Sequence, residues 1–205
     1  MSESKPRRGR KPRLSKDVIV AKALELLDDK GLPDLSMRRI GQALGAQPSA
    51  LYWHFPDKQS LLAAVSAEVL GTPDADDASN ASHDGWETAM RRSAAGLRAH
   101  LLSHRDGAEL VSSSYALGLV ELPLTRELAG PLAAAGATET ATADIAGTLG
   151  HFILGHAFHE QQREAAREAG IEAGGDVDED ASFTAGVELI VAGTAVRLSI
   201  DAAGR

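Results

Sequence analysis

The 205-residue chain contains no cysteine, only eight aromatic residues and no long uninterrupted apolar run. The absence of cysteine excludes disulfides, thiolate chemistry and zinc sites built from cysteine ligands. No run of about 18 apolar residues occurs, so we expect no membrane span. The basic N-terminus is not followed by the apolar segment of a secretory signal. We therefore expect a cytoplasmic protein.

Strand-like alternation is also missing, and the apolar residues are mainly alanine, leucine and valine, which favour helices. We therefore predict an all-α fold. The expected helices cover about 15–30, 36–45, 48–55, 57–70, 85–104, 106–118, 121–135, 138–168 and 181–202. The expected domains are a basic flexible arm (1–14), a helix-turn-helix domain with its connecting helix (15–70), a linker or mobile loop (71–84) and a helical body (85–205).

Charge is distributed unevenly along the chain, although the net charge is -8. Residues 1–65 contain 12 Lys and Arg against 7 Asp and Glu, whereas residues 66–205 contain 9 against 22. This asymmetry predicts a basic head that binds a polyanion and an acidic body with another role.

Two short helices joined by a tight turn are predicted between Leu35 and Lys58. Ser36 is a good N-cap for the first of them, and Gly45 is suited to a left-handed helix end. Pro48 fits the first turn of the next helix, where its missing N–H costs nothing. This is the spacing of a helix-turn-helix.

The second of these helices is rich in polar and aromatic side chains that suit a DNA surface. Leu51 and Phe55 provide its apolar anchor, while Gln47 and Ser49 lie at the end that reaches base edges in a major groove. Side chains suited to contact phosphate, sugar or base are those of Arg38, Arg39, Tyr52, Trp53, His54 and Lys58. The alternative is that the aromatic residues belong to the core, as a single Tyr or Trp commonly does.

The segment LSMRRIGQALGAQPSALYWHFPDKQSLL closely resembles the helix-turn-helix of the tetracycline-repressor (TetR) family, through LYWHF, the Gly45 turn and Lys58. In that family the third helix enters the major groove. The resemblance implies DNA contacts by Arg38, Gln47, Pro48, Ser49, Tyr52, Trp53, His54 and Lys58. Met37 and Ala50 stand where some relatives carry polar readers, so the resemblance does not specify the operator sequence.

The N-terminal arm KPRRGRKPR (5–13) is a separate candidate for DNA binding. Arg8 and Arg10, flanked by prolines, suit insertion into a narrow A·T minor groove. The alternative is a nonspecific charged tail, and both interpretations remain open.

The body also resembles the tetracycline-repressor subgroup, through HRDGAEL (104–110), GHFILGHAFHEQQ (150–162) and FTAGVELIVAG (183–193). The resemblance implies that helices near 143–166 and 183–200 pair with their copies in a four-helix dimer interface. Glycines that would permit close helix approach there are Gly147, Gly150, Gly155, Gly186 and Gly193. It also implies an effector pocket, for which the candidates are Ser93, Leu97, Val111, Ser112, Phe158 and His159.

The subgroup holds a magnesium–drug chelate with a histidine after the RDGA turn and a glutamate in the long helix. Those positions are Val111 and His159 here, so the resemblance implies a different, more apolar or neutral effector, and we expect no cofactor. His156, His159 and Glu160 share a helix face at spacings i, i+3 and i+4 and could supply three metal ligands. The alternative, which we favour, places His151 in the dimer interface and Glu160 in solvent, with no metal bound.

The resulting hypothesis is a homodimeric, ligand-responsive transcriptional regulator, most commonly a repressor, that a small molecule releases from a palindromic DNA operator. Its recognition helices would lie about 34–36 Å apart. One alternative is a DNA-binding protein without an effector. Another is a helical hydrolase that uses Ser112, Ser113 or Ser114 with a histidine, but no nucleophile elbow or phosphate loop supports an enzyme.

Overall fold

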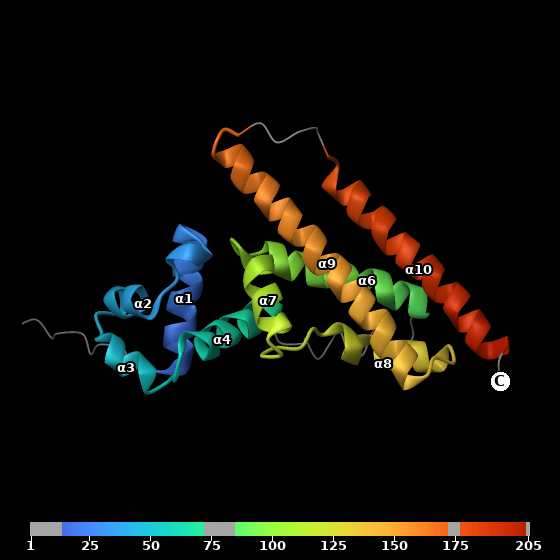
Figure 1. The fold of residues 1–205 in the computed structure, drawn as a ribbon, viewed down its shortest axis with the longest axis horizontal. Helices are drawn as coiled ribbons and strands as arrows, with labels where there is room; N and C mark the ends of the chain where they lie inside the picture. The colour runs from blue at the N-terminus through green and yellow to red at the C-terminus, as the bar shows by residue number, and fades with distance from the viewer. Residues whose placement is uncertain (1–13, 72–84, 172–176, 204–205) are drawn as a thin grey trace, which may run out of the picture.

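The computed structural model describes residues 14–71, 85–171 and 177–203, and every regular element in these ranges is a helix, as predicted (Figure 1). Arg8, Arg10 and most of the expected linker lie outside the described residues. The head contains α1 (Lys16–Lys30), the 3-10 turn η1 (Leu32–Asp34), α2 (Met37–Leu44), α3 (Pro48–Tyr52) and α4 (Lys58–Leu70). The body contains α6 (Trp86–Leu102), α7 (Gly107–Ala116), α8 (Leu124–Ala134), α9 (Glu139–Glu168) and α10 (Glu179–Ala203).

The predicted start and stop signals of the head are confirmed. Ser15 Oγ accepts a hydrogen bond from the Val18 amide at the start of α1, and Ser36 Oγ accepts one from the Arg39 amide at the start of α2. Gly45 ends α2 in the left-handed conformation with φ 62° and ψ 30°. The head closes around a core formed by Ile19, Leu27, Ile40, Leu51, Leu61 and Val65.

The third helix is shorter than predicted, because α3 ends at Tyr52 rather than near Pro56. The amides of His54 and Phe55 both donate to the carbonyl of Leu51, which closes a turn after the helix. Phe55 precedes a proline, which disfavours helical backbone, and its ring is buried in the core. The burial of Phe55 therefore stops the helix early and leaves Trp53 at its end.

In the body, α9 and α10 run side by side in opposite directions, and α6, α7 and α8 pack against α9 (Figure 1). Met90, Leu101, Leu110 and Leu128 are fully buried in this part of the core. The approach of α10 to α9 depends on Gly186, where a Cβ atom would lie 2.2 Å from Phe152 Cζ.

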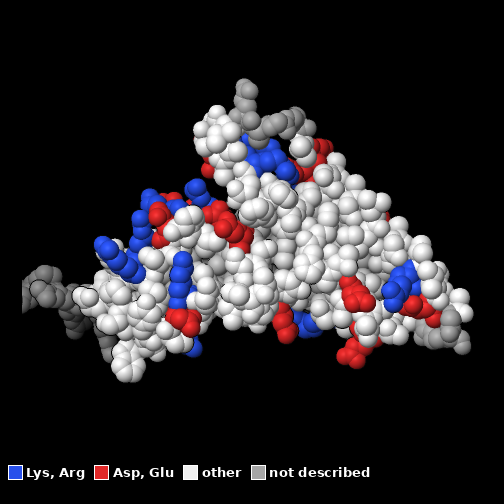
Figure 2. All heavy atoms as spheres, viewed as in Figure 1, with Lys and Arg blue, Asp and Glu red and all other residues white. Residues whose placement is uncertain are grey.

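One face of the body is poor in charge and lies over α9 and α10 (Figure 2). On α10, Leu189, Val196 and Ile200 are 75%, 59% and 62% exposed. The helix is long and apolar enough to cross a membrane by length and composition alone, with a mean hydropathy of 1.5 over its most apolar window, of which 28% is buried. This helix therefore leaves most of its apolar surface without a partner in the single chain.

The five glycines expected at a dimer interface divide into two groups. Gly147, Gly155 and Gly193 have open space where a Cβ atom would be added. At Gly150 such an atom would lie 2.7 Å from Leu122 Cδ1, and Gly186 is similarly close to Phe152. Gly150 and Gly186 therefore serve packing within the chain, whereas the other three are free to face a second copy.

Candidate functional site

The eight described residues predicted to contact DNA lie on α2, on α3 with its N-cap, in the segment after α3 and at the first residue of α4. We call them the recognition surface: Arg38, Gln47, Pro48, Ser49, Tyr52, Trp53, His54 and Lys58. Trp53 is 90% exposed and Tyr52 is 50% exposed. A tryptophan this exposed contributes almost nothing to the core, so the alternative that it is a core residue is wrong. Large exposed aromatic side chains are typical of binding surfaces.

The turn between α2 and α3 holds the recognition surface in a fixed geometry. The Ala46 amide donates to the Gly41 carbonyl at 2.9 Å. A Cβ atom on Gly41 would lie 3.0 Å from the Ala46 carbonyl oxygen, so a larger residue there would have to push the turn outward by a few tenths of an ångström. Leu51 is fully buried on the inner side of α3. The short helix is therefore anchored by its apolar side, and its polar residues face outward.

The cations beside this surface differ in their availability. Arg39 pairs with Asp34 at 3.1 Å, whereas Arg38 and Lys58 are exposed and have no ion pair to any residue that the structure describes. Basic and acidic side chains are interspersed over the α1–α4 end of the molecule (Figure 2). Arg38 and Lys58 are thus the cations on the recognition surface that are free to meet phosphate.

The amino end of α4 is less open to phosphate than its sequence suggests. The first amides of a helix can bind phosphate, and those of α4 would be placed to assist Lys58. The carboxylate of Asp57 instead accepts a hydrogen bond from the Ser60 amide at 2.7 Å and forms a capping box with that serine. Hydrogen bonds from Ser60 lower the pKa of Asp57, so its negative charge persists at the helix end. The Ser60 amide is therefore already occupied and is not free to bind phosphate.

The head meets the body where α4 packs on α6 and α7, and also at the turn between α6 and α7. His104 Nδ1 lies 3.0 Å from Asp28 Oδ2 near the end of α1, and the Arg105 amide donates to the same carboxylate at 3.1 Å. Asp106 Oδ2 accepts a hydrogen bond from the Leu32 amide at 2.7 Å. We call this set of contacts the junction.

The junction is also held from the body side by Gln161 of α9. Its side-chain amide donates to the carbonyls of Leu101 and His104 at 3.1 and 2.8 Å, and its oxygen accepts from the Ala108 amide at 3.0 Å. Asp106 is left-handed with φ 54°, a conformation that aspartate tolerates better than most residues. The long helix α9 is therefore connected to α1 through one rigid turn.

A cavity of about 490 Å³ lies beside the junction. It is lined by Asp28, Leu102, His104, Arg105, Asp106, Glu160, Gln161, Glu164, Ala165, Arg167, Glu168 and Glu179. None of the six predicted effector residues is among them. Ser93, Leu97 and Val111 are buried, Ser112 and Phe158 are partly buried, and His159 is exposed. The assignment of these six residues to an effector pocket stays a prediction.

Ion pairs tie α6, α9 and α10 together on one side of this cavity. Arg98 of α6 donates to both oxygens of Glu160 at 2.9 and 3.0 Å, and to Asp180 at 2.6 Å. The expectation that Glu160 faces solvent is therefore wrong, because Arg98 draws it inward. Arg163 binds both oxygens of Glu179, and this hydrogen bonding lowers the pKa of Glu179.

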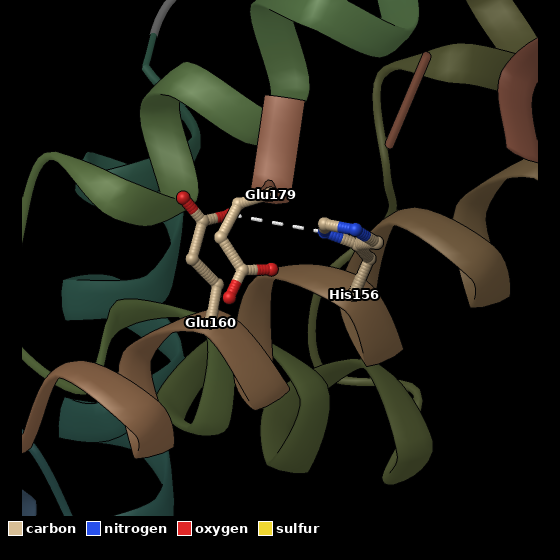
Figure 3. Close-up of side chains that lie close together, drawn as sticks. All are labelled: His156, Glu160 and Glu179. Carbon is tan, nitrogen blue, oxygen red and sulfur yellow. Dashed lines mark ion pairs between the residues drawn. The ribbon is translucent and has the colours of Figure 1, made fainter. Parts of the chain in front are cut away.

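The candidate metal ligands differ from the trio that helical spacing suggested. His156, Glu160 and Glu179 lie together, and one ligand atom from each falls within 4.8 Å of the others (Figure 3). His159 is exposed and is not part of this group. Glu179 belongs to α10, which follows a loop after α9, so no spacing rule within one helix could identify it.

Comparison with known proteins places both parts of the chain in one family. Residues 19–65 match the family model described as "Bacterial regulatory proteins, tetR family", and residues 79–175 match "Tetracyclin repressor-like, C-terminal domain". The chain is 38% identical to the class C tetracycline repressor of Escherichia coli over 98 residues, a match that spans 48% of this chain and 44% of that protein. It is 33% identical to the class E repressor of Escherichia coli over 73% of this chain and 70% of that protein.

Solved structures extend the similarity over nearly the whole chain. The crystal structure of Mycobacterium smegmatis BioQ is 37% identical, with a TM-score of 0.80, over 90% of this chain and 99% of that one. A structure of BioQ with its double-stranded DNA operator is 35% identical, with a TM-score of 0.72, over 90% and 99%. A TetR variant from Acinetobacter baumannii AYE in complex with minocycline is 27% identical, with a TM-score of 0.71, over 91% and 99%. The chain belongs to the tetracycline-repressor (TetR) family of bacterial regulatory proteins.

Proposed function

We propose that this protein is a cytoplasmic transcriptional regulator without enzymatic activity, which binds a palindromic DNA operator as a homodimer and is released by a small molecule. The observation that carries this proposal is the recognition surface, where Trp53 is 90% exposed beside polar side chains on an anchored helix. Exposed aromatic rings that stand beside polar side chains are typical of binding surfaces.

The chemistry of the recognition surface suits double-stranded DNA. The amide of Gln47 can bind the N6 and N7 edge of adenine, and the hydroxyl of Ser49 can donate to or accept from any base. Arg38 and Lys58 would neutralise phosphates, which positions the protein without reading sequence. The BioQ structure with its operator supports DNA as the partner of a protein of this fold.

The uncovered face of α10 supports a homodimer. Leu189, Val196 and Ile200 leave an apolar surface that a second copy would cover. Glu188 lies inside the most apolar part of this helix and forms a two-point ion pair with Arg91 of α6 at 2.6 and 2.8 Å. A paired carboxylate at this position fits a protein interface better than a lipid one.

The dimer can be tested by introducing charge on this face. Leu189→Asp should convert the protein to a monomer in analytical ultracentrifugation, because an aspartate would be buried without a partner. Thr88→Asp, which adds the same charge at an exposed position on α6, should leave the oligomeric state unchanged. A Leu189→Asp protein that sediments like the wild type would place the interface elsewhere.

The junction offers a route from effector to DNA. A ligand that binds one arrangement of the body better than another shifts the equilibrium by that difference in affinity. Movement of α9 would pass through Gln161 to the α6–α7 turn and then through Asp28 to α1. The TetR variant bound to minocycline supports a small molecule as the effector in proteins of this fold.

The proposal is tested by selecting duplexes from a random pool with the full chain, followed by a small-molecule thermal-shift screen. We expect a palindromic motif to be enriched, and we expect a compound that raises Tm to weaken binding to that motif. Failure to enrich any sequence would overturn the assignment as a regulator. Enrichment of a motif whose binding responds to no compound would instead support the effector-independent alternative.

A further inference from the structure

His156 is a buried histidine whose ring nitrogens have no partner. Its side chain is 9% exposed, and neither Nδ1 nor Nε2 has a hydrogen-bond partner among the described residues. The ring packs against Phe152 and Phe183, with centroid separations of 5.7 and 5.3 Å. Buried polar atoms without a partner are uncommon and costly, so an unpartnered imidazole requires an explanation.

Two carboxylates lie beside this ring. Glu160 Oε2 is 3.7 Å from His156 Nδ1, which is beyond hydrogen-bond distance, and Glu179 completes the group (Figure 3). Arg98 and Arg163 hold these carboxylates in place by two-point hydrogen bonds. A carboxylate has about four lone-pair sites, two on each oxygen. Each of these glutamates therefore keeps a free site on both oxygens after its guanidinium has bound.

The carboxylates near the ring outnumber the guanidiniums that they contact. Three carboxylates, those of Glu160, Glu179 and Asp180, contact two guanidiniums, although Asp180 is 86% exposed to solvent. Burial is the main cause that lowers the pKa of His156, and the charge of Arg98 lowers it further, against an opposing effect of Glu160.

We propose that His156, Glu160 and Glu179 bind a divalent transition-metal cation such as Zn²⁺. One imidazole nitrogen and two carboxylate oxygens are a ligand set that zinc accepts at about 2.0–2.2 Å. Ligand atoms in such a tetrahedral site are about 3.4 Å apart. The present atoms fall within 4.8 Å of one another, so a bound metal would have to draw the two carboxylates closer to the ring and rearrange part of their hydrogen bonding to Arg98 and Arg163.

A path for the ion is also present. Glu160 and Glu179 both line the cavity beside the junction, so a cation can reach them from solvent. His156 is not among the cavity-lining residues and lies beside the rings of Phe152 and Phe183. The site uses neither Val111 nor His159, the positions that correspond to the chelate-binding residues of the tetracycline-repressor subgroup. The proposal also does not depend on DNA binding.

The test uses the untagged full chain, freed of metal with a chelator and titrated with Co²⁺ and then Zn²⁺. We expect one ion per chain, a visible absorption band from bound Co²⁺ that Zn²⁺ removes, and a Tm that rises with Zn²⁺ concentration. His156→Phe keeps an aromatic ring against Phe152 and Phe183 but removes both nitrogens. It should weaken binding by at least about 100-fold, because it deletes a direct ligand.

Two further variants make the result decisive. Glu179→Gln should weaken binding as well, and it answers the question if His156→Phe fails to fold. Glu139→Gln, which changes an exposed carboxylate at the start of the same helix, should bind with wild-type affinity. Wild-type protein that binds no ion would overturn the proposal. Equal affinity in the wild type and in a folded His156→Phe or Glu179→Gln protein would do the same, because binding would then belong to other residues.

Discussion

Trp53→Ala should separate DNA binding from folding. The side chain is 90% exposed, so its removal should change the free energy of unfolding by no more than about 0.5 kcal/mol. A buried tryptophan covers about 150–250 Å², and nearly all of that area is available here. At about 25 cal/mol/Å² the gross gain on covering it is about 3–6 kcal/mol. Ordering and desolvation reduce this gain, so we expect Trp53→Ala to lose about 2 kcal/mol of DNA-binding free energy per half-site, which is a roughly 30-fold loss of affinity.

The measurement is fluorescence anisotropy of a labelled, selected duplex at fixed salt, combined with urea unfolding of each variant. Leu117→Ala is the control, because Leu117 is an apolar side chain that is 59% exposed in the body. Its DNA affinity should match the wild type. The reasoning is refuted if Trp53→Ala binds the duplex within twofold of the wild type, or if it loses affinity only because it unfolds.

Other predictions address phosphate contact, helix packing and pH. Lys58→Ala should weaken binding to all sequences. It should reduce the slope of log affinity against log salt by about 0.9 per half-site, or about 1.8 for a dimer on its operator, and an unchanged slope would remove Lys58 from the interface. Gly186→Ala should lower the free energy of unfolding, measured in urea, by up to about 2 kcal/mol, because overpacking against Phe152 outweighs the gain in helix propensity. Gly96→Ala, where the added Cβ meets open space, should raise it by up to about 1 kcal/mol. In metal-free protein, the pKa of His156 is lower in the folded chain than in the unfolded chain. As pH falls below about 6.5, the unfolded chain therefore takes up a proton that the folded chain does not, and Tm should fall. The decline should level off below the folded-state pKa. His156→Phe should flatten that decline, and an unchanged profile would assign it to other groups.

The head was predictable from the sequence because its signals are local. Ser36, Gly45 and Pro48 each act within one turn of their own helix, and all three occupy the predicted positions. The extent of α3 was not predictable in the same way. It depends on the burial of Phe55, which is decided by contacts with the rest of the head rather than by its neighbours in sequence.

In the body, the sequence determined the helices and their family resemblance, whereas tertiary structure decided which residues meet. Helical spacing grouped His156 with His159, but packing against α10 brings Glu179 to His156 and leaves His159 outside. Likewise, Gly186 and Gly193 look equivalent in sequence, yet only Gly186 faces a ring of the same chain. The physical reason is that caps and periodicity act over a few residues of one helix. Side-chain volume and charge between helices act across segments that only the folded chain brings together.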